Sequence, residues 1–114
     1  MSSTTLQLNI SERVAAVSIL NDFKGALDKL AVVLEDIKQF RIEESEWVKS
    51  DRKVEQVGTD TQWTWNDEKG GFKEITVQSE TATYLKDTIN RRSEAGEFTV
   101  ADRAVITLNQ KLTA

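Results

Sequence analysis

Three residue types are absent from this 114-residue chain: cysteine, histidine and proline. Without cysteine there is no disulfide, thiolate nucleophile or zinc–thiolate site, which is easiest to reconcile with a reducing compartment. Without histidine the chain lacks the commonest general base near neutral pH and the commonest imidazole metal ligand. Serine–histidine hydrolysis, cysteine chemistry and histidine-based metal hydrolysis cannot be built from this chain alone. We expect a protein that is not an enzyme, with no catalytic residue, cofactor or metal; any catalysis would depend on carboxylates, lysine or tyrosine.

Long apolar runs and a surplus of positive charge are also missing. No stretch of about 18 apolar residues occurs, and the opening MSSTTLQLNI has neither the basic region nor the apolar core of a secretory signal. The net charge of -4 and the isoelectric point near 4.9 oppose attraction to phosphate backbones. These features predict a cytoplasmic protein that contacts neither a membrane nor nucleic acid directly.

The remaining composition is that of a folded protein. Hydrophobic residues make up 39% and charged residues 30% of the chain, so burial can offset the entropy lost on ordering. We expect one domain over residues 1–114 with a frayed segment at 1–5.

The longest regular apolar pattern runs from Ile10 to Phe40. Its apolar residues recur at alternating steps of four and three and so share one helical face: Ala16, Leu20, Phe23, Leu27, Leu30, Leu34 and Ile37. A flank of further apolar residues widens this stripe: Ile19, Ala26, Val33 and Phe40. Asn9 and Glu12 have the spacing of a capping box at the start of the helix. Two interpretations stay open, because the unbroken pattern favours one long helix whereas the polar, glycine-containing stretch 21–25 favours two helices joined by a turn.

Three β segments follow. Residues 54–57 and 62–66 form a predicted hairpin around Gly58, and 72–77 resumes β character after a glycine-containing loop. Two helices are predicted after them: one over 80–93, capped by Ser79 and stopped by Gly96, and a last one that Thr99 and Asp102 cap. The predicted fold is therefore α+β: a long or broken N-terminal helix packed on a small three-stranded antiparallel sheet, with two C-terminal helices.

The order of these features resembles a group of small, mostly uncharacterised proteins encoded by bacteriophages and prophages. The resemblance covers most of the chain and is carried by five generic motifs: Ile10-Ser11-Glu12-Arg13, Glu43-Glu44-Ser45-Glu46-Trp47, Trp65-Asn66, Lys73-Glu74-Ile75 and Phe98-Thr99. Members of the group tend to have a proline and glycine break after the first short helix, where this chain has Leu20 to Gly25 without proline. The resemblance implies a phage or prophage origin and action in the cytoplasm of a bacterial host, and it implies no catalytic residue.

The densest acidic cluster consists of Glu43, Glu44 and Glu46. Its carboxylates could hold a hard cation or share a proton. A charge run beside a helix end is more often a solvated face. We therefore interpret these residues as a candidate acidic face and not as a metal site.

The tryptophans are the best candidates for a specific surface. Trp63 and Trp65 alternate with polar residues on one predicted strand and should share a sheet face. The helix available to cover the sheet favours core packing, while the alternative is a binding or dimer surface to which Trp47 would also belong.

These residues favour a non-enzymatic, phage-like module that binds a protein, either a bacterial host protein or a second copy of the chain. An alternative is an acidic host-takeover or anti-defence inhibitor that competes with nucleic acid for a bacterial enzyme. A carboxylate-based enzyme is the third and weakest hypothesis.

Overall fold

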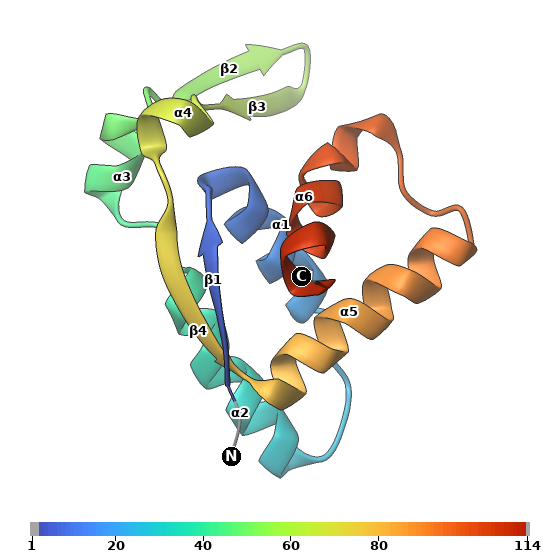
Figure 1. Ribbon diagram of the computed structural model, residues 1–114. Helices are drawn as coiled ribbons and strands as arrows, with labels where there is room; N and C mark the ends of the chain where they lie inside the picture. Colours follow the sequence, from blue (N-terminus) through green and yellow to red (C-terminus); the bar gives the residue numbers. More distant parts are fainter. Residues whose placement is uncertain (1–2, 114) are drawn as a thin grey trace.

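The computed structural model describes residues 3–113 (Figure 1). In chain order its elements are β1 (Ser3–Leu8), α1 (Ile10–Leu20), α2 (Leu27–Ile37), the 3-10 turn η1 (Lys38–Phe40), α3 (Glu44–Lys49), β2 (Lys53–Val57), β3 (Asp60–Thr64), α4 (Asp67–Gly70), β4 (Lys73–Gln78), α5 (Ser79–Glu94), the 3-10 turn η2 (Val100–Asp102) and α6 (Arg103–Thr113). The four longer helices lie around the β1–β4 ribbon and leave one of its faces exposed, and the β2–β3 hairpin projects from one end of the molecule (Figure 1).

The central ribbon pairs the first strand with the last. β1 and β4 are antiparallel, with Leu6 opposite Ile75 and Leu8 opposite Lys73. Alternation places the apolar side chains of both strands on one buried face: Leu6, Leu8, Ile75 and Val77. The opposite face is polar and exposed, and there the Thr5 and Thr76 hydroxyls are 3.1 Å apart.

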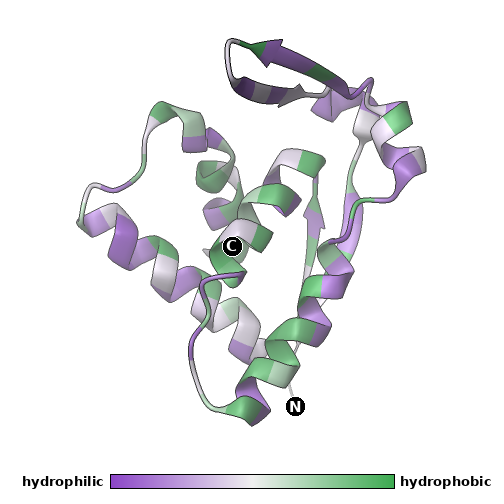
Figure 2. Ribbon diagram, turned by 180° about the vertical axis from the view of Figure 1, so that it is seen from behind, coloured by the Kyte–Doolittle hydropathy of each residue, from purple (hydrophilic) through white to green (hydrophobic). Residues whose placement is uncertain are grey.

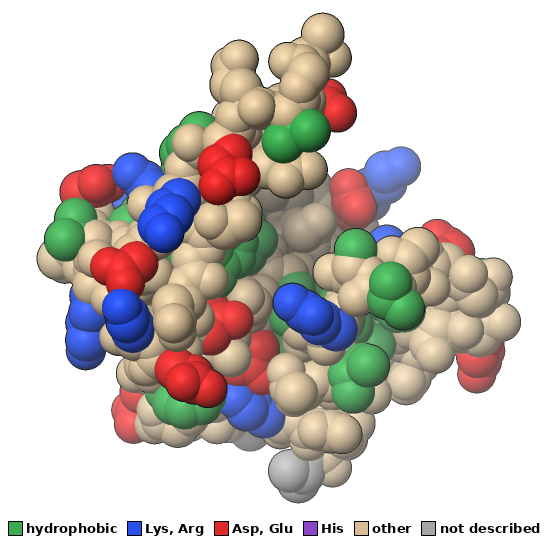
Figure 3. All heavy atoms as spheres, turned by 90° about the horizontal axis from the view of Figure 1, so that it is seen from above, with side chains coloured by type: hydrophobic (Ala, Val, Ile, Leu, Met, Phe, Trp, Pro, Cys, Tyr) green, Lys and Arg blue, Asp and Glu red, His purple; other side chains and the backbone are tan. Residues whose placement is uncertain are grey.

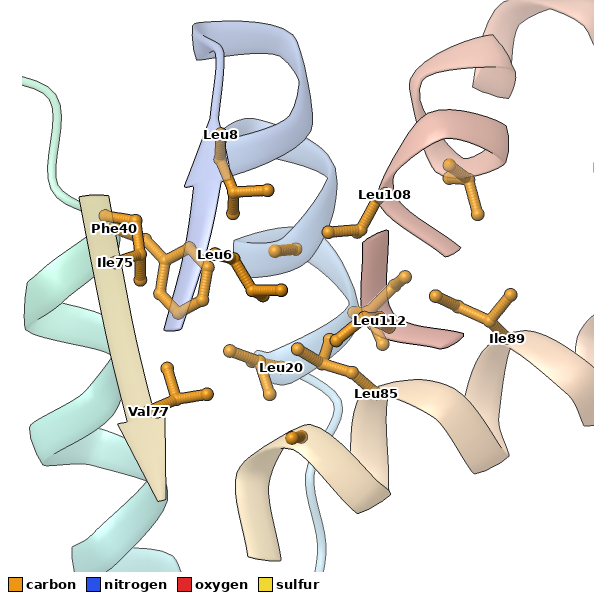
Figure 4. Packing of buried hydrophobic residues seen from close by; sticks show 14 of the residues in the cluster. Leu6, Leu8, Leu20, Phe40, Ile75, Val77, Leu85, Ile89, Leu108 and Leu112 are labelled. Carbon is orange, nitrogen blue, oxygen red and sulfur yellow. The ribbon is translucent and has the colours of Figure 1, made fainter. Parts of the chain in front are cut away.

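The core lies between this ribbon and the helices. Figure 4 shows Leu20 of α1, Phe40 of η1, Leu85 of α5 and Leu108 of α6 pointing toward the apolar face of the ribbon. Each of these four side chains is at most 1% exposed. Burial of this apolar surface is the main stabilising contribution to the fold.

The prediction of a three-stranded sheet was wrong, because β4 pairs with β1 and leaves β2 and β3 as a separate two-stranded sheet. The short helix α4 and Gly71, whose φ is +70°, turn the chain away from β3 before β4 begins. Ile75 and Val77 need burial, which the apolar residues of β1 supply. The exposed hairpin offers no such cover.

The N-terminal region also differs from the prediction. The first described element is a strand where a helix was expected, and Ser3 to Thr5 of the predicted frayed segment belong to this strand. Met1 and Ser2 lie outside the described residues.

Of the two interpretations of the first helix, the broken one is confirmed. α1 ends at Leu20, Asn21 forms its C-cap, and α2 begins six residues later at Leu27. The break changes which face of α2 is buried: Val33 is buried, whereas Leu27 and Leu34 of the predicted stripe are 83% and 53% exposed. Figure 2 shows this helix hydrophobic along most of its length.

Local capping predictions agree with the structure at three helix ends. Asn9 and Glu12 form the predicted capping box of α1, and Thr99 and Asp102 form one at η2. Gly96 has φ +68° and its N–H donates to Ser93, while Glu97 N–H donates to Arg92, which is the Schellman arrangement. These devices act within a few residues, so the sequence alone reveals them.

The start of α5 is different, because no local side chain caps it. Asp36 of α2 accepts hydrogen bonds from Gln78 N–H at 3.0 Å and from the Thr81 hydroxyl at 2.5 Å. Ser79, the predicted cap, is the first helical residue instead. The cap therefore comes from a distant helix.

Candidate interaction surface

All three tryptophans lie at the end of the molecule that carries the hairpin. Trp47 belongs to α3, Trp63 to β3, and Trp65 follows β3, while Arg52 links α3 to β2. We call these four residues the tryptophan–arginine patch. The patch joins residues that are up to 18 positions apart by bringing α3 beside the hairpin base, which the bond from Asn66 N–H to Ser50 C=O closes at 2.7 Å.

Arg52 is stacked between two of the indoles. Its guanidinium carbon lies 4.9 Å from the ring centroid of Trp63 and 5.3 Å from that of Trp47. Trp47 also contacts Trp65 edge-on, with 5.3 Å between centroids and 66° between ring planes. Cation–π and edge-to-face contacts of this kind orient the side chains before any partner arrives.

Trp65 anchors the patch to the body of the protein. Its indole N–H donates to the Ser11 hydroxyl at 3.1 Å and to Asp67 Oδ1 at 3.0 Å. The Ser11 hydroxyl and backbone N–H in turn donate to the Asp67 carboxylate at 2.6 and 3.0 Å. Asp67 thus places a negative charge at the start of α1, where the helix dipole favours it.

Trp63 is placed differently and is 51% exposed. It faces Val54, also 51% exposed, across the hairpin, and all ten strand residues of this hairpin are exposed. The expected shared sheet face of Trp63 and Trp65 is not formed, because β3 ends at Thr64. Half-buried Trp65 is bonded to α1, whereas Trp63 is a surface residue.

Beneath the patch lies a buried arginine that joins α1 to α3. Arg13 is 1% exposed, pairs with Glu46, and donates to the backbone carbonyls of Phe40 and Arg41. The hydrogen bond from the Arg13 guanidinium lowers the pKa of the Glu46 carboxyl below its ordinary value. The Lys69 ammonium of α4 likewise lowers the pKa of Asp51, which follows α3. These ion pairs hold α3 and α4 in place.

The predicted acidic face has an arginine beside each of its carboxylates. Glu43 lies 3.7 Å from Arg41 and Glu44 lies 3.4 Å from Arg52, while Glu46 pairs with Arg13. Glu43 and Glu46 also form the capping box of α3. The view from above shows acidic and basic side chains as neighbours over this end of the molecule (Figure 3). These carboxylates therefore serve α3 and its ion pairs.

Three parts of this site were not predicted from the sequence. Arg52 gave no signal beyond being a charged residue between two segments, and Arg13 occupies a helix position that its charge argues against burying. The Ser11–Asp67–Trp65 network joins residues more than 50 positions apart. The sequence feature that points to Arg52 is its place between a helix that carries Trp47 and a strand that carries Trp63.

Comparisons with known proteins add no family to this description. No protein-family model, no curated protein and no solved structure matches the chain. The phage or prophage origin therefore stays a prediction from the resemblance described above.

Within residues 3–113, no helix is both long and apolar enough to cross a membrane. The same part of the chain contains no group of three or more acidic side chains arranged to hold a metal ion.

Proposed function

We propose that this chain is a non-enzymatic protein-binding module and that the tryptophan–arginine patch is its contact surface. The proposal rests on the position of Trp63: its indole is half exposed on a projecting hairpin and contacts Arg52 on one side. Tryptophan and arginine are the residues that most often dominate the binding energy of protein interfaces.

The patch has the two properties that favour protein binding over a purely structural role. Trp63 and Val54 present apolar area to solvent, and the contact of Trp63 with Arg52 fixes its position in advance. Preorganisation of this kind lowers the entropy lost on association. Trp65 and Trp47 form the rigid support behind it.

The acidic inhibitor hypothesis draws less support from the same region. Its candidate face, Glu43, Glu44 and Glu46, has a positively charged neighbour at each carboxylate. Such pairing reduces the negative potential that a mimic of nucleic acid needs. The same pairing weighs against the carboxylate-enzyme hypothesis, since a general acid near neutral pH needs a raised pKa and that of Glu46 is lowered.

Affinity capture with matched variants tests the proposal. The tagged wild-type chain and its W63A and F72A variants would be incubated with bacterial lysate, because the predicted host is a bacterium. The bound proteins would then be quantified by mass spectrometry. Phe72 is the control because it is an exposed aromatic side chain, 66% exposed, outside the patch. We expect a stoichiometric partner that F72A retains and that W63A loses by at least about ten-fold, a typical loss for an interface hot spot.

The fold must survive the substitution for this result to count. Because Trp63 is half exposed, W63A should cost less than about 1 kcal/mol of unfolding free energy, which urea denaturation would measure. A partner held equally by W63A would contradict the proposal. Capture that falls steeply with added salt and is lost after charge reversal of Glu43 and Glu44 would favour the acidic inhibitor instead.

A further inference from the structure

The β2–β3 hairpin has one strand edge turned away from the rest of the molecule. β2 pairs with β3 alone, and in both ribbon views β3 lies on the side of the body while β2 is outermost (Figures 1 and 2). A two-stranded ribbon exposed on both faces is only marginally stable by itself. An exposed strand edge is also a template for pairing with another strand.

The turn determines which peptide groups of β2 point outward. Gly58 has φ +66° and Thr59 has no positive φ, so Gly58–Thr59 is a two-residue turn with glycine first, closed by the pair Val57 and Asp60. In such a hairpin the closing pair exchanges hydrogen bonds and alternate residues do so after it. The peptide groups of Val54 and Gln56 therefore face the open edge.

The side chains of β2 make this edge complementary to itself. When two β2 strands pair antiparallel about a two-fold axis at Val54, Val54 lies opposite Val54 of the second copy. Lys53 then lies opposite Glu55 of the second copy, twice by symmetry. An axis at Lys53 or Glu55 would instead place like charges opposite each other, which is destabilising.

The same register extends the exposed apolar surface. Val54 and Trp63 are cross-strand neighbours on one face of the hairpin. Pairing at Val54 places this pair beside the same pair of the second copy. The four side chains then form one row across four strands, with the two Val54 residues in the middle and one Trp63 at each end. The charged residues Lys53 and Glu55 alternate to the other face.

From this geometry we infer that the β2 edge binds a second copy of this chain, giving a two-fold dimer with a four-stranded antiparallel sheet centred on Val54. This inference deepens the proposed function, because it names a second copy as one partner of the binding module. The dimer presents two tryptophan–arginine patches on one continuous sheet. Its contacts are the main-chain hydrogen bonds that Val54 exchanges with Val54 of the second copy, plus the two Lys53–Glu55 pairs.

Sedimentation equilibrium of the purified chain over a wide concentration series tests the dimer directly. We expect a monomer–dimer equilibrium in which K53E and E55K each raise the dimer dissociation constant about ten-fold, because each places two like-charged pairs across the interface. The double variant K53E/E55K restores opposite charges and should return near to the wild-type constant. An equimolar mixture of the K53E and E55K chains should form a heterodimer more tightly than either variant pairs with itself.

Two further variants separate edge pairing from general charge effects. D60K changes a charge on β3, off the paired edge, and should leave the dissociation constant within about two-fold of wild type. V54P removes an outward N–H that the hairpin itself does not use, and edge positions accept proline. It should abolish the dimer while the hairpin persists.

The inference is overturned if the wild-type chain stays monomeric throughout the series, or if a dimer forms that K53E, E55K and V54P leave unchanged. A dimer that both single charge variants weaken but the double variant fails to restore would also overturn the Val54 register. These results are independent of the lysate experiment, since a chain that stays monomeric can still capture a partner through Trp63 and a dimer can form without one.

Discussion

At the scale of single residues, Arg13 shows how a buried charge is accommodated in this protein. Its guanidinium is 1% exposed and contacts the Glu46 carboxylate and two backbone carbonyls. A buried ion pair adds little by itself, but removing one partner leaves the other charge buried and unpaired. The pair therefore makes the position of α3 depend on Glu46.

Glu46→Ala should lower the free energy of unfolding by about 3 kcal/mol, the usual cost of breaking a buried pair. Urea denaturation at neutral pH would measure it. Glu44→Ala is the matched control, because Glu44 lies in the same helix and pairs with Arg52 at a largely exposed site, 73% exposed for the Glu44 side chain. Its cost should stay below about 1 kcal/mol. An equal loss of unfolding free energy in the two variants would show that the Arg13–Glu46 pair stabilises the protein no more than an exposed ion pair does.

At the scale of secondary-structure elements, α5 is started by a side chain from another helix. Asp36 of α2 is 7% exposed and accepts bonds from Gln78 N–H and the Thr81 hydroxyl. Its negative charge also lies at the end of α5 that the helix dipole makes positive. Tertiary packing here replaces the cap that the local sequence lacks.

Asp36→Ala should therefore destabilise the protein by about 2 kcal/mol, because it removes both the cap and a buried acceptor. Ser79→Ala, which removes the cap expected from the sequence, should change stability by less than about 0.5 kcal/mol. Thermal unfolding followed by circular dichroism would compare the two variants. A larger loss for Ser79→Ala than for Asp36→Ala would mean that the local cap dominates after all.

At the scale of the whole molecule, polar contacts help to join the end that carries the patch to the helical body. The Arg13–Glu46 pair joins α1 to α3, and the Ser11–Asp67–Trp65 network joins α1 to the segment after β3. All three tryptophans lie at this end, while the longer helices α1, α2, α5 and α6 lie in the body (Figure 1). Tryptophan emission and far-ultraviolet circular dichroism thus report on different parts of the protein.

Acid should loosen the end that carries the patch before it unfolds the body. The pKa of Glu46 is lower in the folded than in the unfolded protein, so its contribution is fully present above the unfolded pKa of about 4.3. That contribution is lost as the pH falls through the folded pKa. Tryptophan emission should therefore change at a higher pH than the helical signal when the protein is titrated below about pH 4.

The control is Glu46→Gln, which cannot titrate at this position. Its tryptophan emission should depend less on pH in the same range, at the cost of lower stability at neutral pH. If emission and helical signal of the wild-type chain change together, and Glu46→Gln leaves the profile unaltered, the acid response does not pass through Glu46.

The sequence by itself determined the local features of this protein. Hydrogen bonds between residues two or three positions apart form the caps at Asn9 and Thr99, and the positive φ of Gly96 ends α5. The hairpin around Gly58 was predicted for the same reason, because its turn and strands are adjacent in the chain. Trp63 and Trp65 were predicted as a candidate surface from their alternation on one strand, and Trp47 was named with them as a tryptophan that could belong to it.

Only the tertiary structure decided how these pieces pair. Thr5 and Thr76 meet across 71 positions, and no local preference chooses between β1 and β3 as the partner of β4. The choice follows from burial, since β1 covers Ile75 and Val77 with apolar residues whereas the hairpin stays in solvent. The same packing buries Arg13 and leaves Trp63 exposed, because burial depends on the sum of all contacts around a residue and not on its neighbours in the chain.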